Sequence, residues 1–143
     1  MDTLTTITKK EIENKIFTFR NLQVMIDRDL AEIYQVEVKR LNEQIKRKKE
    51  RFPENFRFQL SDNETFELVA NCGRFKLLKH SSSNPYAFTE QGVAMLSAVL
   101  NSKIAIEVSI QIINAFVEMR KFIHHNNVLL SRMENIEYTI RWV

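Results

Sequence analysis

The chain has 143 residues, of which 44% are hydrophobic and 10% aromatic, a composition that is typical of one folded domain and excludes a disordered chain. Only two glycines and two prolines are present, so we expect few tight turns and a helix-rich fold. The formal net charge is +3, and the pI near 9.1 favours an anionic partner. The single cysteine, Cys72, excludes an internal disulfide, and no apolar run approaches the ~20 residues that cross a bilayer, so we expect a cytoplasmic protein without membrane contact.

The N-terminal part of the chain predicts a hairpin after a variable start. Residues 1–15 are expected to be flexible or to form one short polar helix. Strand-forming residues then occupy 16–19 and 23–26. Asn21, between these two runs, tolerates the left-handed conformation of a tight turn. We therefore expect a β-hairpin here.

A helix-turn-helix is predicted over residues 29–51. Asp29 and Glu32 have the spacing of a capping box, so the first helix is expected to begin at Asp29. The second helix is expected to span the basic stretch 38–51, with Glu37 as its cap. Apolar residues at helical spacing would seat this second helix on the first: Val38, Leu41 and Ile45.

Positive charge is concentrated on this second helix. Residues 39–51 contain seven Lys or Arg and two Glu, a local charge of +5, so the rest of the +3 chain sums to −2. Such a patch attracts phosphate, and Arg and Gln side chains also recognise base edges in the major groove. A solvated helix face is the alternative interpretation. Base contacts are predicted for Arg40, Gln44 and Arg47. Phosphate contacts are predicted for Lys39, Lys46, Lys48, Lys49, Arg51 and Arg57.

Beyond the basic helix, three strands and a helix are predicted. Alternation over 56–60 indicates a half-buried strand that pairs with the first hairpin, with Arg57 facing solvent or phosphate. Ser61 and Glu64 form a second capping box at the start of a helix. Two more strands are expected, over residues 74–79 and 85–88. The loop between them is a candidate wing against the DNA backbone, and a flexible surface hairpin is an equally good interpretation.

Two helices are predicted as a C-terminal scaffold. Thr89 is expected to cap the first, which ends at Asn101. The second is expected to run from Lys103 to about His124, where Asn126 and its neighbour interrupt the pattern.

The tail, residues 126–143, predicts a helix with a short coiled-coil seam. Its apolar residues alternate at steps of four and three: Leu129, Met133, Ile136, Ile140 and Val143. Barely two heptads are too few to be stable alone, so we expect the tail either to form a homodimer or to pack back on the core.

Three stretches, in order along the chain, resemble one known family. They are VMIDRDLAEIYQVEVKRLNEQIKR in the predicted helix-turn-helix, RFPENFRFQL at 51–60 and PYAFTEQGVAMLSAVL at 85–100. Together they are similar to the phage DNA-binding module of the KilA-N superfamily, and more narrowly to the branch named for the N-terminal domain of a phage open reading frame six. The resemblance covers residues 16–122. It implies an α+β domain related to winged helices, DNA binding, and residence on phages or other mobile elements, sometimes as an antirepressor-like regulator.

Two positions depart from the family pattern. The family often has glycine after the first helix, where this chain has Gln35, and a left-handed residue other than glycine costs about 1 kcal/mol there. It also has a small hydroxyl residue before the recognition helix, where this chain has Val38.

The residues and the resemblance together predict an α+β fold: a helix-rich, winged-helix-like helix-turn-helix with a small antiparallel sheet and a C-terminal helical scaffold. We expect a DNA-binding domain over 16–125 between the N-terminal segment 1–15 and the tail 126–143. The predicted function is a double-stranded DNA-binding regulator of phage or mobile-element type, transcriptional or antirepressor-like. It is expected to act in the cytoplasm of a bacterial host and to associate with the nucleoid when bound to DNA.

Two other functions are alternatives to this prediction. A protein-interaction module, whose long helix and tail bind a phage or host regulator, is the main alternative. The hypothesis of RNA binding has less support, because the sequence lacks the exposed aromatic motifs usual for single-stranded RNA. Cys72 and His80 belong to no metal or triad motif, and two glycines cannot build a phosphate loop. We therefore expect no enzyme, no cofactor and no metal.

Overall fold

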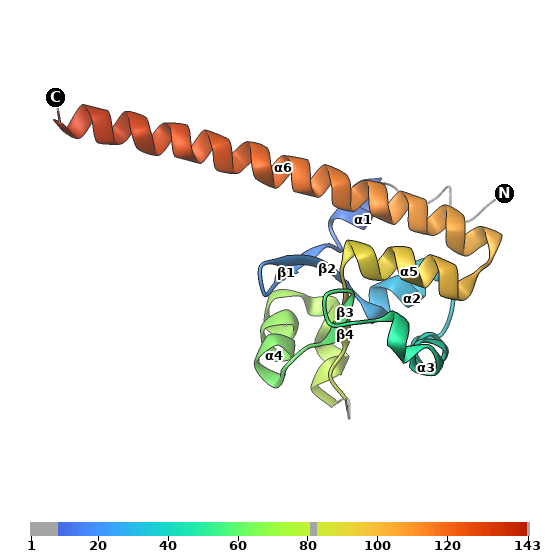
Figure 1. Ribbon diagram of the computed structural model, residues 1–143. Coiled ribbons are helices and arrows are strands. Elements are labelled where there is room, and N and C mark those ends of the chain that lie inside the picture. Colours follow the sequence, from blue (N-terminus) through green and yellow to red (C-terminus); the bar gives the residue numbers. More distant parts are fainter. Residues whose placement is uncertain (1–8, 81–82, 143) are drawn as a thin grey trace.

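The computed structural model describes residues 9–80 and 83–142 of the chain (Figure 1). Side chains are described through Leu129, apart from residues 79–82, and again at Arg132. Two predictions therefore fall in part outside the described residues and side chains. These are the candidate wing at 81–82 and the seam positions Met133, Ile136, Ile140 and Val143.

Short strands alternate with helices along the chain, and the predicted α+β class is confirmed. The elements are α1 (Lys9–Glu13), β1 (Phe17–Phe19), β2 (Leu22–Ile26), α2 (Asp27–Tyr34), α3 (Val38–Arg47), the 3₁₀ helix η2 (Lys49–Arg51), β3 (Arg57–Gln59), α4 (Asp62–Asn71), the 3₁₀ helix η3 (Gly73–His80), β4 (Tyr86–Phe88), α5 (Glu90–Leu100) and α6 (Lys103–Trp142).

The strands form one antiparallel sheet in the order β1-β2-β4-β3. β1 and β2 are the predicted hairpin, and its turn holds both Arg20 (φ 56°) and Asn21 (φ 61°) in the left-handed region. The prediction that the strand at 56–60 pairs with this hairpin is wrong, because β4 lies between them. Ala87 and Phe88 of β4 are fully buried on opposite faces of the sheet, so this strand takes the central position.

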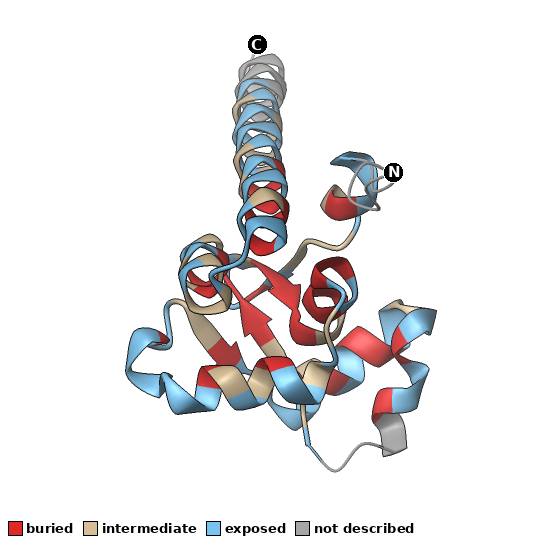
Figure 2. Ribbon diagram, turned by 90° about the vertical axis from the view of Figure 1, so that its right-hand side faces the viewer, coloured by how far each residue is buried: buried red, intermediate tan, exposed pale blue. Residues whose placement is uncertain are grey.

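Each face of the sheet has its own apolar core, and the strands are buried between the two (Figure 2). On one face, residues such as Met25 pack with the helices α1, α2, α3, α5 and α6. On the other face, Val24 and Ile26 pack with α4 and η3. The period-two alternation of β2 thus supplies both cores.

The start of α2 differs from the prediction. The helix begins at Asp27, and Ile26 at its N-cap makes no side-chain capping bond, so the predicted capping box at Asp29 is wrong. Asp29 is 2% exposed and instead accepts two hydrogen bonds from Arg74, at 3.2 and 2.9 Å, with Lys15 at 3.8 Å. A cation from a distant element satisfies the carboxylate that the local pattern assigned to a cap.

The segment after α4 also differs. The capping box of Ser61 and Glu64 is confirmed, but residues 74–79 form the helical η3 and not a strand. Phe75 and Leu78, three positions apart, are both buried, which is the spacing of a 3₁₀ turn. The candidate wing therefore lacks one of its two strands.

α6 is a single helix of 40 residues, so the predicted interruption at Asn126 is wrong. Asparagine is a weak helix former that lowers helix stability by less than about 1 kcal/mol, too little to end a long helix. A continuous helix cannot fold back on the domain, which removes that alternative for the tail. None of the described helices combines the length and apolarity that crossing a bilayer requires.

Candidate nucleic-acid interface

The turn between α2 and α3 has the geometry usually supplied by glycine. Gln35 lies in the left-handed region at φ 61° and ψ 43°. The N–H of Val36 donates to the carbonyl of Ala31 at 2.9 Å, and that of Gln35 donates to Glu32 at 3.1 Å, as in a Schellman motif. Glu37 takes the predicted N-cap position of α3, but its side chain makes no capping bond. The left-handed turn that glycine would adopt freely is thus kept at a strain of about 1 kcal/mol.

α3 is seated by the apolar stripe that the sequence predicted. Leu41 and Ile45 are fully buried, and Val38 packs against the same core. The helix ends at Arg47 and is therefore shorter than the predicted 38–51. The chain leaves the helix so that Phe52 can be buried, with its ring edge-on to that of Phe88 at a centroid distance of 6.2 Å.

A buried carboxylate joins α3 to the rest of the domain. Asp27 is 1% exposed, and its Oδ2 accepts hydrogen bonds from Asn42 Nδ2 of α3 at 3.1 Å and from the Tyr86 N–H of β4 at 3.2 Å. Its Oδ1 accepts from Arg28 Nη1 at 3.1 Å. One carboxylate at the start of α2 thereby fixes the position of α3 relative to the sheet.

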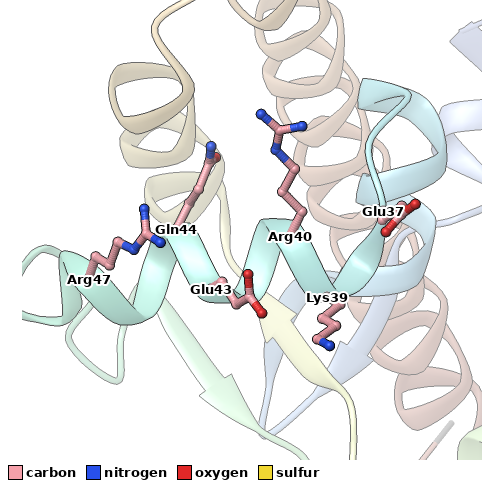
Figure 3. Close-up of a pocket in the computed structure, with 6 residues that line it drawn as sticks. All are labelled: Glu37, Lys39, Arg40, Glu43, Gln44 and Arg47. Atoms are coloured by element: carbon pink, nitrogen blue, oxygen red, sulfur yellow. The ribbon is translucent and has the colours of Figure 1, made fainter.

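The outward face of α3 carries a shallow hollow of about 480 Å³ (Figure 3). The lining residues are Glu37, Lys39, Arg40, Glu43, Gln44 and Arg47. In Figure 3, Arg40, Gln44 and Arg47 extend from the same side of the helix, whereas Lys39 and Glu43 extend from the other. The three residues predicted to contact bases are thus side by side and belong to one rigid element.

A second hollow, of about 420 Å³, lies between α3 and the sheet. It is lined by Lys39, Asn42, Glu43, Lys46, Lys49, Arg57 and Tyr86. Four of the six residues predicted to bind phosphate meet here, although they come from three different elements. The remaining two, Lys48 and Arg51, are exposed just after α3 and line neither hollow.

Arg57 is held in place by aromatic stacking. Its guanidinium carbon lies 3.6 Å from the centroid of the Tyr86 ring, a close cation–π contact. The side chain is half-buried rather than free in solvent, and burial lowers the pKa of Arg57 from its ordinary value. An ordered guanidinium loses less rotamer freedom than a mobile lysine when it binds a phosphate oxygen.

Sequence reasoning missed two residues of this surface. Asn42 lies one helical turn from both Lys39 and Lys46, so helical spacing alone was sufficient to find it. Tyr86 had no local signal, because it reaches the hollow only through the pairing of β4 with β3.

Cys72 and the histidines of α6 lie apart from this surface. Cys72 is half-buried and accepts a hydrogen bond from Arg74 Nη1 at 3.0 Å. His124 and His125 are exposed on α6. Within the described part of the chain, no three His, Cys, Asp or Glu side chains are grouped so that they can hold a metal ion.

The fold and this surface define an α+β domain that presents one basic helix of a helix-turn-helix on its exterior. The chain belongs to the ORF6N domain family, whose model matches residues 14–99, more than half of the sequence. The match confirms the phage-type branch of the KilA-N superfamily that the sequence resembled, and it contains α2, α3 and all four strands. No curated protein and no solved structure gives a significant match.

Proposed function

We propose that this protein binds double-stranded DNA through α3 and acts as a regulator of a phage or mobile element, either transcriptional or antirepressor-like. The observation that carries the proposal is the common orientation of Arg40, Gln44 and Arg47 beside a hollow lined with cations. Membership of a phage-type family supports the biological setting. The proposed function is binding without catalysis, in the cytoplasm of a bacterial host and on its nucleoid.

The dimensions of α3 suit the major groove. Its ten residues make a helix about 15 Å long, and a groove about 12 Å wide admits one helix. Arg40 and Arg47 are long enough to donate two hydrogen bonds each to guanine, and Gln44 pairs with adenine in the same way.

The second hollow would receive the DNA backbone beside the groove. Lys39 and Lys46 line this hollow on the side of α3 away from the predicted base contacts. Lys49 and Arg57 extend the positive surface toward the sheet. Phosphate contacts of this kind fix the register of a protein on the duplex without selecting a sequence. Base selection would therefore depend on the α3 face and overall affinity on the hollow.

The first experiment measures binding to random duplex DNA over a salt series, followed by selection of a preferred site. We expect affinity to fall steeply with salt, because bound phosphates release counterions. Arg47→Ala should cost roughly 1–3 kcal/mol on the preferred site and relax its sequence. Lys46→Ala, in the second hollow, should weaken binding to all sequences alike and reduce the salt slope by about 1.

Lys121→Ala is the matched control, since it removes one exposed cation from α6, outside the ORF6N match. It should leave both the affinity and the selected sequence unchanged. Equal effects of Arg47→Ala and Lys46→Ala on every sequence would remove the base-contacting role. No retention of the unaltered protein on duplex DNA at low salt would overturn the proposal and favour a protein-interaction module. Competition between duplex DNA and duplex RNA for the protein shows which of the two nucleic acids it binds.

A further inference from the structure

Only the first half of α6 is covered by the domain, and the second half extends past it (Figure 1). At 40 residues the helix is about 60 Å long, longer than the domain requires. Side chains buried against the domain follow steps of three and four: Ala105, Val108, Ile112 and Ala115. The same steps continue without interruption to Met119, Phe122, Asn126 and Leu129. We refer to these last four positions as the α6 seam.

Three of the four residues of the α6 seam are apolar, and two of these three are exposed. The exposed fractions of Phe122 and Leu129 are 61% and 41%, so two large apolar side chains on one line of the helix face solvent. In the sequence, the steps continue at positions 133, 136 and 140 with Met, Ile and Ile. From residue 119 to residue 140 the pattern covers about three heptads, the repeat of a coiled coil.

We infer that the extending half of α6 pairs with the same segment of a second copy of this chain, as an antiparallel coiled coil. Charge favours a copy of itself as the partner. Residues 119–132 carry three cations and no acid; Arg120 pairs with Glu90 of α5 at 2.9 Å, which leaves Lys121 and Arg132 for a partner helix, whereas residues 133–143 carry two Glu and one Arg. Antiparallel pairing brings the basic part of each helix next to the acid-containing part of the other, and parallel pairing brings like charges together.

The position of the domain leads to the same orientation. Because the seam shares the register of Val108 and Ile112, it faces roughly the side of α6 that the domain covers, with a drift of about 20° per heptad. A parallel partner on that side would carry its own residues 103–118 into the space that this domain occupies. An antiparallel partner places its domain beyond the other end of the shared coil.

Analytical ultracentrifugation without DNA tests the association. We expect a reversible dimer that Phe122→Asp weakens by about tenfold or more, because a charge in the seam must be desolvated. His124→Asp is the matched control, since His124 is exposed and lies two positions outside the seam. Asn126→Leu should strengthen the dimer by about tenfold, because a polar residue in a seam position reduces stability.

A distance measurement tests the orientation. Spin labels at Lys121→Cys, in a Cys72→Ser background, should lie about 30 Å apart if the coil extends from residue 121 to 142, at about 1.5 Å per residue. A parallel coil would hold the two labels within about 20 Å of each other. A short distance would overturn the antiparallel arrangement.

A monomer at every soluble concentration, or equal effects of Phe122→Asp and His124→Asp, would overturn the pairing itself. Circular dichroism of each variant shows whether the domain is still folded, and Phe122 lies beyond the residues that the domain buries. Because the association is measured without DNA, a failure to dimerise would not contradict the proposed function of α3. A failure to bind DNA would likewise not contradict the pairing of α6.

Discussion

Asp27 offers the sharpest test of how the domain positions α3. Replacement by alanine removes the acceptor of Asn42 Nδ2 and of the Tyr86 N–H, and both donors, which belong to half-buried residues, then lose this partner. A donor left without a partner costs about 1–3 kcal/mol, with the lower values where water reaches it, so Asp27→Ala should reduce the free energy of unfolding by about 2–4 kcal/mol. That loss is a large fraction of the ~5–15 kcal/mol stability of a domain.

Asp27→Asn should cost far less, for a geometric reason. Both donors bind the same oxygen, Oδ2, which the amide oxygen of asparagine can replace. Only the bond from Arg28 to Oδ1 is lost, and we expect about 1 kcal/mol for it. Urea unfolding followed by circular dichroism measures both variants on one scale, provided that the slope with denaturant is unchanged.

Asp62→Ala provides the control for the loss of an exposed carboxylate at a helix start. Asp62 is exposed in the first turn of α4, so its removal should cost within about 1 kcal/mol. If Asp27→Ala and Asp27→Asn prove equally destabilising, or if the alanine variant costs no more than this control, the buried network does not hold α3 and the reasoning fails.

Two further predictions concern the interior. Gly92→Ala would place a β-carbon against the backbone carbonyl of Phe56 and should cost more than about 2 kcal/mol by urea unfolding, whereas Gly73→Ala, with open space around it, should be near neutral; similar values for both would contradict this packing. Burial raises the pKa of Tyr34 to about 12, against 10.0 unfolded, with Ser109 at 2.6 Å as its hydrogen-bond partner. The folded state therefore gains its full stability from the neutral Tyr34 hydroxyl below about pH 10. This gain is lost as the pH rises toward 12, and the free energy of unfolding falls by roughly 2–3 kcal/mol. Urea unfolding at a series of alkaline pH values should show that Tyr34→Phe reduces this fall, and an equal fall in both proteins would refute it.

Local patterns in the sequence were sufficient where one element decides its own conformation. The stripe of Leu41 and Ile45 predicted how α3 is seated, and Thr89 predicted the start of α5. Helical spacing also predicted the outward direction of Arg40 and Arg47. These features depend on side chains within a few residues of one another.

The tertiary structure alone decided what depends on distant partners. The residues of the hollow beside α3 meet because β4 enters the sheet between β2 and β3, and no local pattern contains that pairing. Asp29 has the sequence of a cap, yet the distant Arg74 determines its role, because a buried carboxylate is stabilised more by a cation than by backbone N–H groups already paired in a helix. The start of a helix, the order of strands and the use of a charge were therefore settled by contacts that the linear sequence does not display.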